Sequence, residues 1–123
     1  MATDTNAAWT RAVSDAELVE GSRLVVRAGA QEVLVVRQGG RVYALESHCP
    51  HMGRQLKDAH ISVDGVLECP LHHSQFELAT GRCRAWAPWP PLVGPMLGAL
   101  RTRRDLRVFP TRLQDGAIWV NVG

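Results

Sequence analysis

The hydrophobic and polar positions of this chain follow the short periods of β-strands over most of its length. Residues 22–28 and 32–38 are two runs rich in β-branched side chains, and residues 41–45 alternate between polar and apolar side chains. A glycine-containing turn separates the first two runs, and Gly39-Gly40 marks a tight turn before the third. We therefore predict three consecutive antiparallel strands in the first half of the chain.

The same pattern continues to the end of the chain. An Asp-Gly pair between two apolar runs near the C-terminus is a β-hairpin signal, and another Asp-Gly pair precedes a run that ends at Cys69. Helical periodicity is scarce, so we expect only a helical turn over residues 14–18 and a short helix over residues 96–103. The pattern predicts an all-β fold. Further strands are predicted at residues 9–13, 66–68, 74–78, 106–113 and 117–122.

The length and composition are those of one ordinary globular domain. The chain has 123 residues, of which 46% are hydrophobic and 21% are charged, and these values argue against disorder. We expect residues 1–7 to be a flexible tail and residues 8–123 to form a single domain. The net charge of +2 is too small to indicate a nucleic-acid partner, which requires a clustered basic face.

The N-terminal residues and the cysteines indicate the compartment. The first residues lack the basic and apolar regions of a signal peptide, and no apolar run approaches the ~20 residues needed to cross a bilayer. Three cysteines cannot form a closed set of disulfides. We therefore expect a cytoplasmic protein that makes no contact with a membrane.

Two short motifs carry the metal-binding chemistry of the chain. Cys49 and His51 form the first motif, and after seventeen intervening residues Cys69 and His72 form the second. Each motif offers a thiolate and an imidazole, both common metal ligands, and a proline that restricts the backbone between them. Two such pairs predict a metal site with two sulfur and two nitrogen ligands.

The order of these ligands bears on which metal they hold. A single zinc ion accepts two thiolates and two imidazoles, but usually from one cysteine pair and one histidine pair. Here each motif mixes one cysteine with one histidine, which suits a binuclear site where one iron takes both cysteines and the other iron takes both histidines. The ligand order favours an iron–sulfur cluster, and one zinc ion stays as the alternative.

With these motifs the chain resembles the Rieske-type [2Fe–2S] ferredoxins, such as the ferredoxin components of ring-hydroxylating dioxygenase systems. The resemblance extends over nearly the whole chain. It implies the Rieske fold, in which an antiparallel β-sandwich base carries a small cluster-binding β-subdomain, with cluster-binding loops at about residues 46–76. The residues that carry the resemblance are Cys49-Pro50-His51-Met52-Gly53, Cys69-Pro70-Leu71-His72, Gln75-Phe76-Glu77-Leu78-Ala79-Thr80-Gly81, Phe109-Pro110-Thr111-Arg112-Leu113 and Ile118-Trp119-Val120.

The resemblance also implies a ligand set and a role. Cys49 and Cys69 would hold the inner iron of a [2Fe–2S] cluster, and His51 and His72 would hold the outer, solvent-facing iron. A cluster with four protein ligands has no open position for a substrate. We therefore expect a carrier of single electrons that is not itself an enzyme.

The partners follow from the same resemblance. Similar soluble ferredoxins pass electrons from a flavoprotein reductase to a terminal oxygenase, so we expect a monomer that binds both partners transiently. Met52, Arg54 and Leu71 would rim the docking patch. Two alternatives stay open: a fixed small Rieske subunit of a larger oxidoreductase, of the nitrite-reductase type, and a zinc-stabilised binding module.

Several positions depart from the high-potential Rieske proteins of cytochrome bc complexes. Arg54 and Leu71 stand where those proteins have the cysteines of an extra disulfide. Ser74 matches one hydroxyl donor to the cluster sulfurs, but Phe76 replaces the other donor, a tyrosine, so we expect a low-to-middle reduction potential. His73 stands where many relatives have glycine, and we expect either a partner contact or an ordinary surface histidine.

Overall fold

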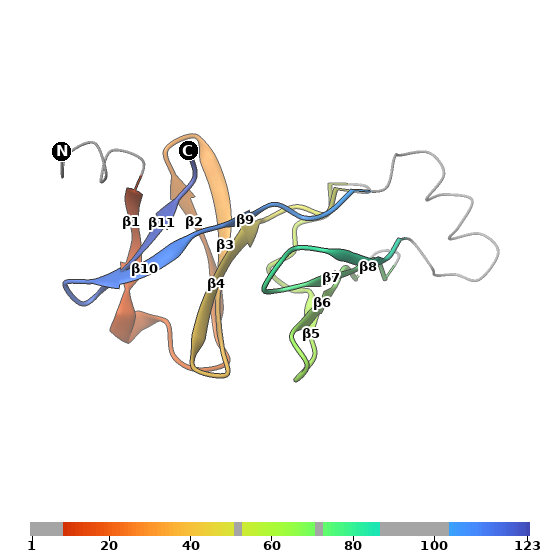
Figure 1. Ribbon diagram of the computed structural model, residues 1–123, viewed down its shortest axis with the longest axis horizontal. Helices are drawn as coiled ribbons and strands as arrows, with labels where there is room; N and C mark the ends of the chain where they lie inside the picture. The colour runs from red at the N-terminus through yellow and green to blue at the C-terminus, as the bar shows by residue number, and fades with distance from the viewer. Residues whose placement is uncertain (1–8, 51–52, 71–72, 87–103) are drawn as a thin grey trace. The chain divides into compact units, whose positions relative to one another are not determined.

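Short antiparallel strands make up almost all of the regular structure in the computed structural model, which describes residues 9–50, 53–70, 73–86 and 104–123 (Figure 1). The prediction of an all-β fold is therefore confirmed. The predicted helix over residues 96–103 lies outside the described residues. The chain divides into two compact units, Met1–Glu46 with Phe109–Gly123 and Ser47–Val108.

The first unit contains two antiparallel sheets. One has the strand order β1-β11-β10 and the other has the order β2-β3-β4-β9. The three consecutive strands predicted in the first half of the chain are β2, β3 and β4, paired by hairpins as expected. The bounds are β1 (Trp9–Ser14), β2 (Arg23–Ala28), β3 (Gln31–Gln38), β4 (Arg41–Glu46), β9 (Val108–Phe109), β10 (Thr111–Gln114) and β11 (Ala117–Asn121).

A hydrophobic core joins the two sheets of this unit. Val33 and Val35 on β3 share one face because side chains alternate along a strand, and both are fully buried. They belong to one cluster with Ile118 and Val120 of β11. Apolar residues on the inner faces of two sheets thus form a β-sandwich, as the resemblance to the Rieske-type ferredoxins implied.

Two sequence predictions in this unit differ in detail from the structure. The strand predicted over residues 106–113 is divided at Pro110, and its two parts, β9 and β10, join different sheets. Proline has no backbone N–H to give to a ladder, although its carbonyl accepts a hydrogen bond from the Asn121 amide at 3.0 Å. The predicted helical turn is a 3₁₀ helix, η1 (Asp15–Glu17).

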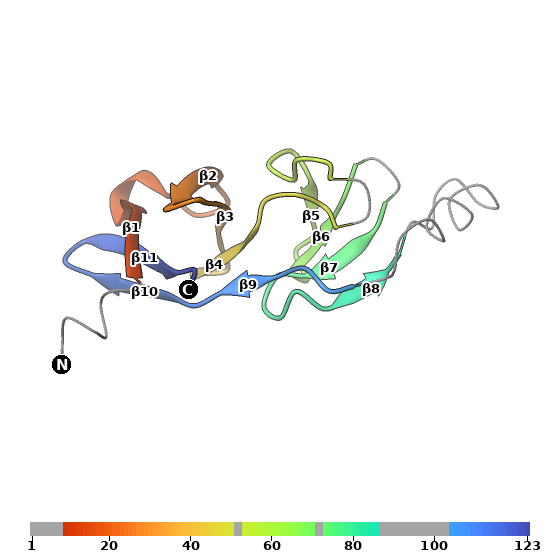
Figure 2. The same ribbon diagram turned by 90° about the horizontal axis from the view of Figure 1, so that it is seen from above.

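The second unit is a four-stranded antiparallel meander, seen from two directions in Figures 1 and 2. Its strands are β5 (His60–Ile61), β6 (Val66–Glu68), β7 (Gln75–Glu77) and β8 (Cys83–Ala85). The strands β6 and β7 were predicted, whereas β5 and β8 were not. Leu67 and Phe76 are cross-strand partners on β6 and β7, and both are fully buried.

The segment that precedes β9 is hydrogen-bonded to the hairpin formed by β7 and β8. The Gly81 carbonyl accepts a hydrogen bond from the Leu106 amide at 2.8 Å, and a Cβ at Gly81 would lie only 1.9 Å from the Leu106 carbonyl oxygen. Asp105 accepts a 2.8 Å hydrogen bond from the Cys83 amide through Oδ1. Asp105 and Leu106 are therefore held on the β7–β8 hairpin, and glycine is required for the close approach.

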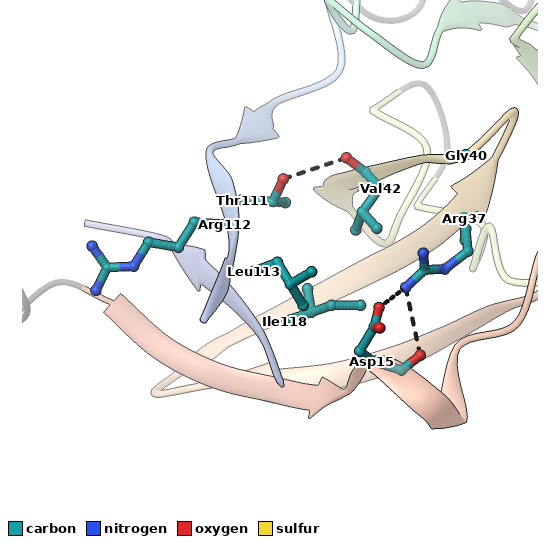
Figure 3. A pocket seen from close by; sticks show the side chains of 8 residues that line it. All are labelled: Asp15, Arg37, Gly40, Val42, Thr111, Arg112, Leu113 and Ile118. Atoms are coloured by element: carbon teal, nitrogen blue, oxygen red, sulfur yellow. Dashed lines mark hydrogen bonds and ion pairs between the residues drawn. The ribbon is translucent and has the colours of Figure 1, made fainter. Parts of the chain in front are cut away.

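A cavity of about 270 Å³ lies within the first unit (Figure 3). Arg37 and Asp15 form an ion pair at its edge, and the Arg37 Nε donates to the Leu18 carbonyl at 2.5 Å. These charged groups therefore bind one another and the backbone. The cavity is lined by Asp15, Arg37, Gly40, Val42, Thr111, Arg112, Leu113 and Ile118. Among the described residues, no helix is long and apolar enough to cross a membrane.

We predict that Arg37→Met destabilises the protein by about 2 kcal/mol, because it removes a charged donor from the Leu18 carbonyl as well as the ion pair. Asp15→Asn removes only the ion pair, whose carboxylate side is 41% exposed, and should cost at most about 1 kcal/mol. Urea unfolding of both variants measures the difference. Equal losses would show that the bond to Leu18 contributes nothing.

Candidate metal centre

Cys49 begins a tight turn whose backbone hydrogen bonds fix its position. Its N–H donates to the Arg54 carbonyl at 2.8 Å, and its carbonyl accepts from the Gly53 amide at 2.8 Å. The turn is closed behind the cysteine by an isolated antiparallel bridge between His48 and Gln55. Cys49 is 3% exposed, so its thiol lies in a protected position.

Cys69 begins a second turn with the same hydrogen bonds. Its N–H donates to the Ser74 carbonyl at 2.8 Å, and its carbonyl accepts from the His73 amide at 3.0 Å. Strands β6 and β7 lead into and out of this turn, with Glu68 and Gln75 as cross-strand partners. Cys69 is 2% exposed, so the two cysteines have equivalent surroundings.

The equivalence extends to the backbone angle that closes each turn. The fourth residue after each cysteine has a positive φ, 74° at Gly53 and 64° at His73. Glycine adopts this conformation freely, whereas most residues with a side chain pay about 1–2 kcal/mol for it. His73, expected to be a partner contact or a surface histidine, therefore occupies the strained position of its turn.

Each candidate ligand pair consists of a cysteine and a histidine, and the structure describes only the cysteines. His51 and His72 lie outside the described residues, as do Met52 and Leu71 of the expected docking patch. Without those histidines, the described part of the chain shows no group of three or more side chains suited to a metal. The assignment of Cys49, His51, Cys69 and His72 as ligands therefore stays a prediction.

The cysteines and their neighbours nevertheless fit a metal cluster. All three cysteines of the chain are described, and each is buried and outside any disulfide. Cys49 and Cys69 each stand at the start of a turn, whereas Cys83 stands on strand β8. The pair at the turns thus offers two equivalent, protected thiolates, which is the sulfur half of the predicted ligand set.

The structure describes both residues that the sequence analysis linked to the reduction potential, Ser74 and Phe76. Ser74 is 1% exposed and follows His73 directly. Phe76 is fully buried on β7, so the position of the expected tyrosine is filled by an apolar ring. Arg54 is exposed, as a residue of a docking patch must be.

Sequence reasoning missed a side-chain network around the second turn. Glu68 Oε1 accepts a 2.9 Å hydrogen bond from the side-chain Nε2 of Gln75, and Glu68 Oε2 lies 3.4 Å from His73 Nδ1. The spacing of the three residues in the chain gave no sign of it. Only the pairing of Glu68 with Gln75 across β6 and β7, which is a matter of strand register, brings them together.

Comparison with known proteins gives a family and close relatives. The Rieske [2Fe-2S] domain family matches residues 8–109. The ferredoxin component of the naphthalene 1,2-dioxygenase system of Pseudomonas putida is 30% identical over 114 residues, which are 93% of this chain and 95% of that protein. The ferredoxin subunit of anthranilate 1,2-dioxygenase from Burkholderia cepacia is 31% identical over 78% of this chain and 75% of its own length.

A solved structure agrees with these relatives. A chain of the complex of reduced oxygenase and oxidized ferredoxin in carbazole 1,9a-dioxygenase is 26% identical to this chain and matches it with a TM-score of 0.71. The match covers 93% of each chain. The likeness in fold therefore extends along almost the full length of both.

We predict that Gly53→Val destabilises the protein by about 1–2 kcal/mol, because a β-branched residue resists the positive φ of 74°. Among the described residues, nothing lies within 4 Å of the position that a Cβ would take, so we expect backbone strain to dominate the loss. The matched variant Gly53→Asn should lose less, since asparagine adopts this conformation more readily. Urea unfolding measures both losses. If Gly53→Asn is no more stable than Gly53→Val, backbone strain at Gly53 is not the cause.

Proposed function

The chain belongs to the Rieske [2Fe-2S] family, and we propose that it carries its cluster on Cys49, His51, Cys69 and His72. In this arrangement the two thiolates hold one iron and the two imidazoles hold the other. The observation that supports the proposal most directly is the pair of equivalent turns, each of which begins with a buried cysteine. The family favours this cluster over the single zinc ion that the ligand types alone allowed.

The ligand set determines how readily the site takes an electron. A Rieske cluster, when bound, accepts and returns single electrons. Two cysteine thiolates bring two negative charges, whereas the four thiolates of a plant-type ferredoxin bring four, and neutral imidazoles add none. Fewer negative charges around the irons favour reduction, so this ligand set raises the potential above that of a four-cysteine site.

The protein acts as an electron carrier for an oxygenase system and does not itself catalyse a reaction. Its relatives are ferredoxin components of dioxygenase systems, and one structural relative comes from a complex of oxygenase and ferredoxin. We infer that the chain receives electrons from a flavoprotein reductase and passes them to a terminal oxygenase. A carrier that meets two partners in turn needs small and transient contacts.

The exposed part of the first turn is the expected place for these contacts. Gly53 and Arg54 are both exposed, and they directly follow the segment that carries His51. In our proposal the partners approach this surface, Met52 and Leu71 add apolar contacts, and the protein works as a cytoplasmic monomer. The family match over residues 8–109 extends through both compact units and supports the prediction of one domain over residues 8–123.

Three buried cysteines allow a sharp test of the ligand assignment. We predict that Cys69→Ser loses the cluster, whereas Cys83→Ser keeps two irons per chain and the rhombic EPR signal of a reduced Rieske centre. The reason is that Cys83 lies on strand β8, away from the two proposed ligand turns, where its thiol donates a weak 3.6 Å hydrogen bond to the Ala85 carbonyl. Iron analysis, visible absorption and EPR of both variants provide the measurement.

The same preparation tests the function. The wild-type protein should carry electrons from a reductase to the oxygenase of a ring-hydroxylating system, and Cys69→Ser should not. Gel filtration with each partner separates a carrier from a fixed subunit, since a carrier elutes alone. A colourless protein with one zinc ion, or a complex that persists through gel filtration, would contradict the proposal.

Ser74 should tune the potential of the cluster. We predict that Ser74→Ala lowers the potential by roughly 40 mV, which corresponds to about 1 kcal/mol for one electron, because a hydroxyl that donates to cluster sulfur favours the reduced state. Ser47→Ala is the matched control, since Ser47 is equally buried and its hydroxyl lies 3.1 Å from His48 Nδ1. Redox titration measures the midpoint potential of both variants. Equal shifts in Ser74→Ala and Ser47→Ala would exclude this role for Ser74.

A further inference from the structure

The two cysteine turns have the same backbone hydrogen bonds, but a different residue type closes each of them. Gly53 closes the first turn at φ 74°, and His73 closes the second at φ 64°. Histidine has a Cβ that disfavours this conformation, so the second turn needs an interaction that the first does not. The side chains around His73 supply one.

Glu68 links the two ends of the second turn through its carboxylate. Glu68 directly precedes Cys69. Its Oε1 accepts a hydrogen bond from the side-chain Nε2 of Gln75 at 2.9 Å, and its Oε2 lies 3.4 Å from His73 Nδ1. The side chain of Glu68 is 28% exposed and that of His73 is 41% exposed, so solvent only partly screens the contact. One side chain thus connects the entering strand, the leaving strand and the strained residue.

The first turn serves as an internal comparison. His48 and Gln55 take the places of Glu68 and Gln75, as the residues directly before and six positions after each cysteine. Glutamine is present in both turns, but the residue before the cysteine is a carboxylate only in the second. In the first turn the Gln55 side-chain oxygen accepts from the Lys57 amide at 3.1 Å. The carboxylate therefore occurs in the turn whose closing residue is not glycine.

We propose that Glu68 is a positioning residue for the second ligand turn and that its negative charge lowers the reduction potential of the cluster. Its carboxylate holds Gln75 and His73 and so maintains the turn that presents Cys69. Because reduction adds an electron to the cluster, a fixed negative charge one residue from a cysteine ligand disfavours that step. This role rests on the proposed cluster, but its structural part can be measured without it.

The charge is tested by redox titration at one pH and ionic strength. Glu68→Gln keeps the size of the side chain but removes the charge, and we expect the midpoint potential to rise. Asp64→Asn is the matched control, because it removes the same charge from the exposed turn at the other end of β6. We expect the shift in Glu68→Gln to exceed the shift in Asp64→Asn, and a shift no larger than the control overturns the proposal.

The positioning role is tested by a double-mutant cycle on unfolding and on cluster loss. Glu68→Gln should lower the unfolding midpoint and speed loss of the cluster about tenfold, as for an outer partner of a metal ligand. In the His73→Gly background, where the turn no longer needs the contact, both effects should shrink at least about twofold. Equal effects of Glu68→Gln in both backgrounds overturn the proposal.

Two further outcomes are decisive. If Glu68→Gln alone does not fold, recovery of folded protein in the double variant with His73→Gly supports the proposal, and continued failure overturns it. If the wild-type protein lacks the EPR signal of a reduced Rieske centre, the proposed function is wrong. A normal wild-type signal with an unaltered Glu68→Gln variant overturns only the role of Glu68.

Discussion

The structure around the proposed metal site depends on the backbone hydrogen bonds of the two cysteines that we propose as ligands. Cys49 and Cys69 each use the N–H and the carbonyl within their own turn, at distances of 2.8 to 3.0 Å. A buried backbone has few other ways to satisfy both groups, so the position of each thiol is set by the chain itself. The backbone hydrogen bonds of each turn therefore hold the cysteine that we propose as a sulfur ligand in a defined place.

The two turns are supported in different ways behind the cysteines. The second turn ends a true hairpin, in which Leu67 and Phe76 pair across β6 and β7 and are fully buried. The first turn has a single bridge between His48 and Gln55 and a 2.7 Å hydrogen bond from the Leu56 amide to the Ser47 carbonyl. The first turn thus closes on an unstrained glycine, whereas the second, which has more strand pairing behind it, closes on a strained histidine.

The sequence predicted most of this fold because its strands are long or clearly patterned. β2, β3 and β4 were found from β-branched runs and Gly-containing turns, and the cysteine turns were found from ligand types. β5 has two residues, which is too short for a period to emerge. β6 and β7 are as short as β8, but β6 follows an Asp-Gly turn and β7 lies in a longer alternating run over residues 74–78. The division of the strand predicted over residues 106–113 at Pro110 follows from a known property of proline, yet which sheet each part joins is decided by tertiary packing.

The side chains that distinguish the site were hidden for another reason. The equivalence of His73 and Gly53 emerges only when the hydrogen bonds of both turns are compared, because the histidines proposed as ligands stand at different offsets, two after Cys49 and three after Cys69. The two motifs therefore look different in sequence, although the backbone hydrogen bonds of their turns match. Since the ligand types of a family leave little room for variation, the residues that close and support each turn are where members can differ in stability and potential.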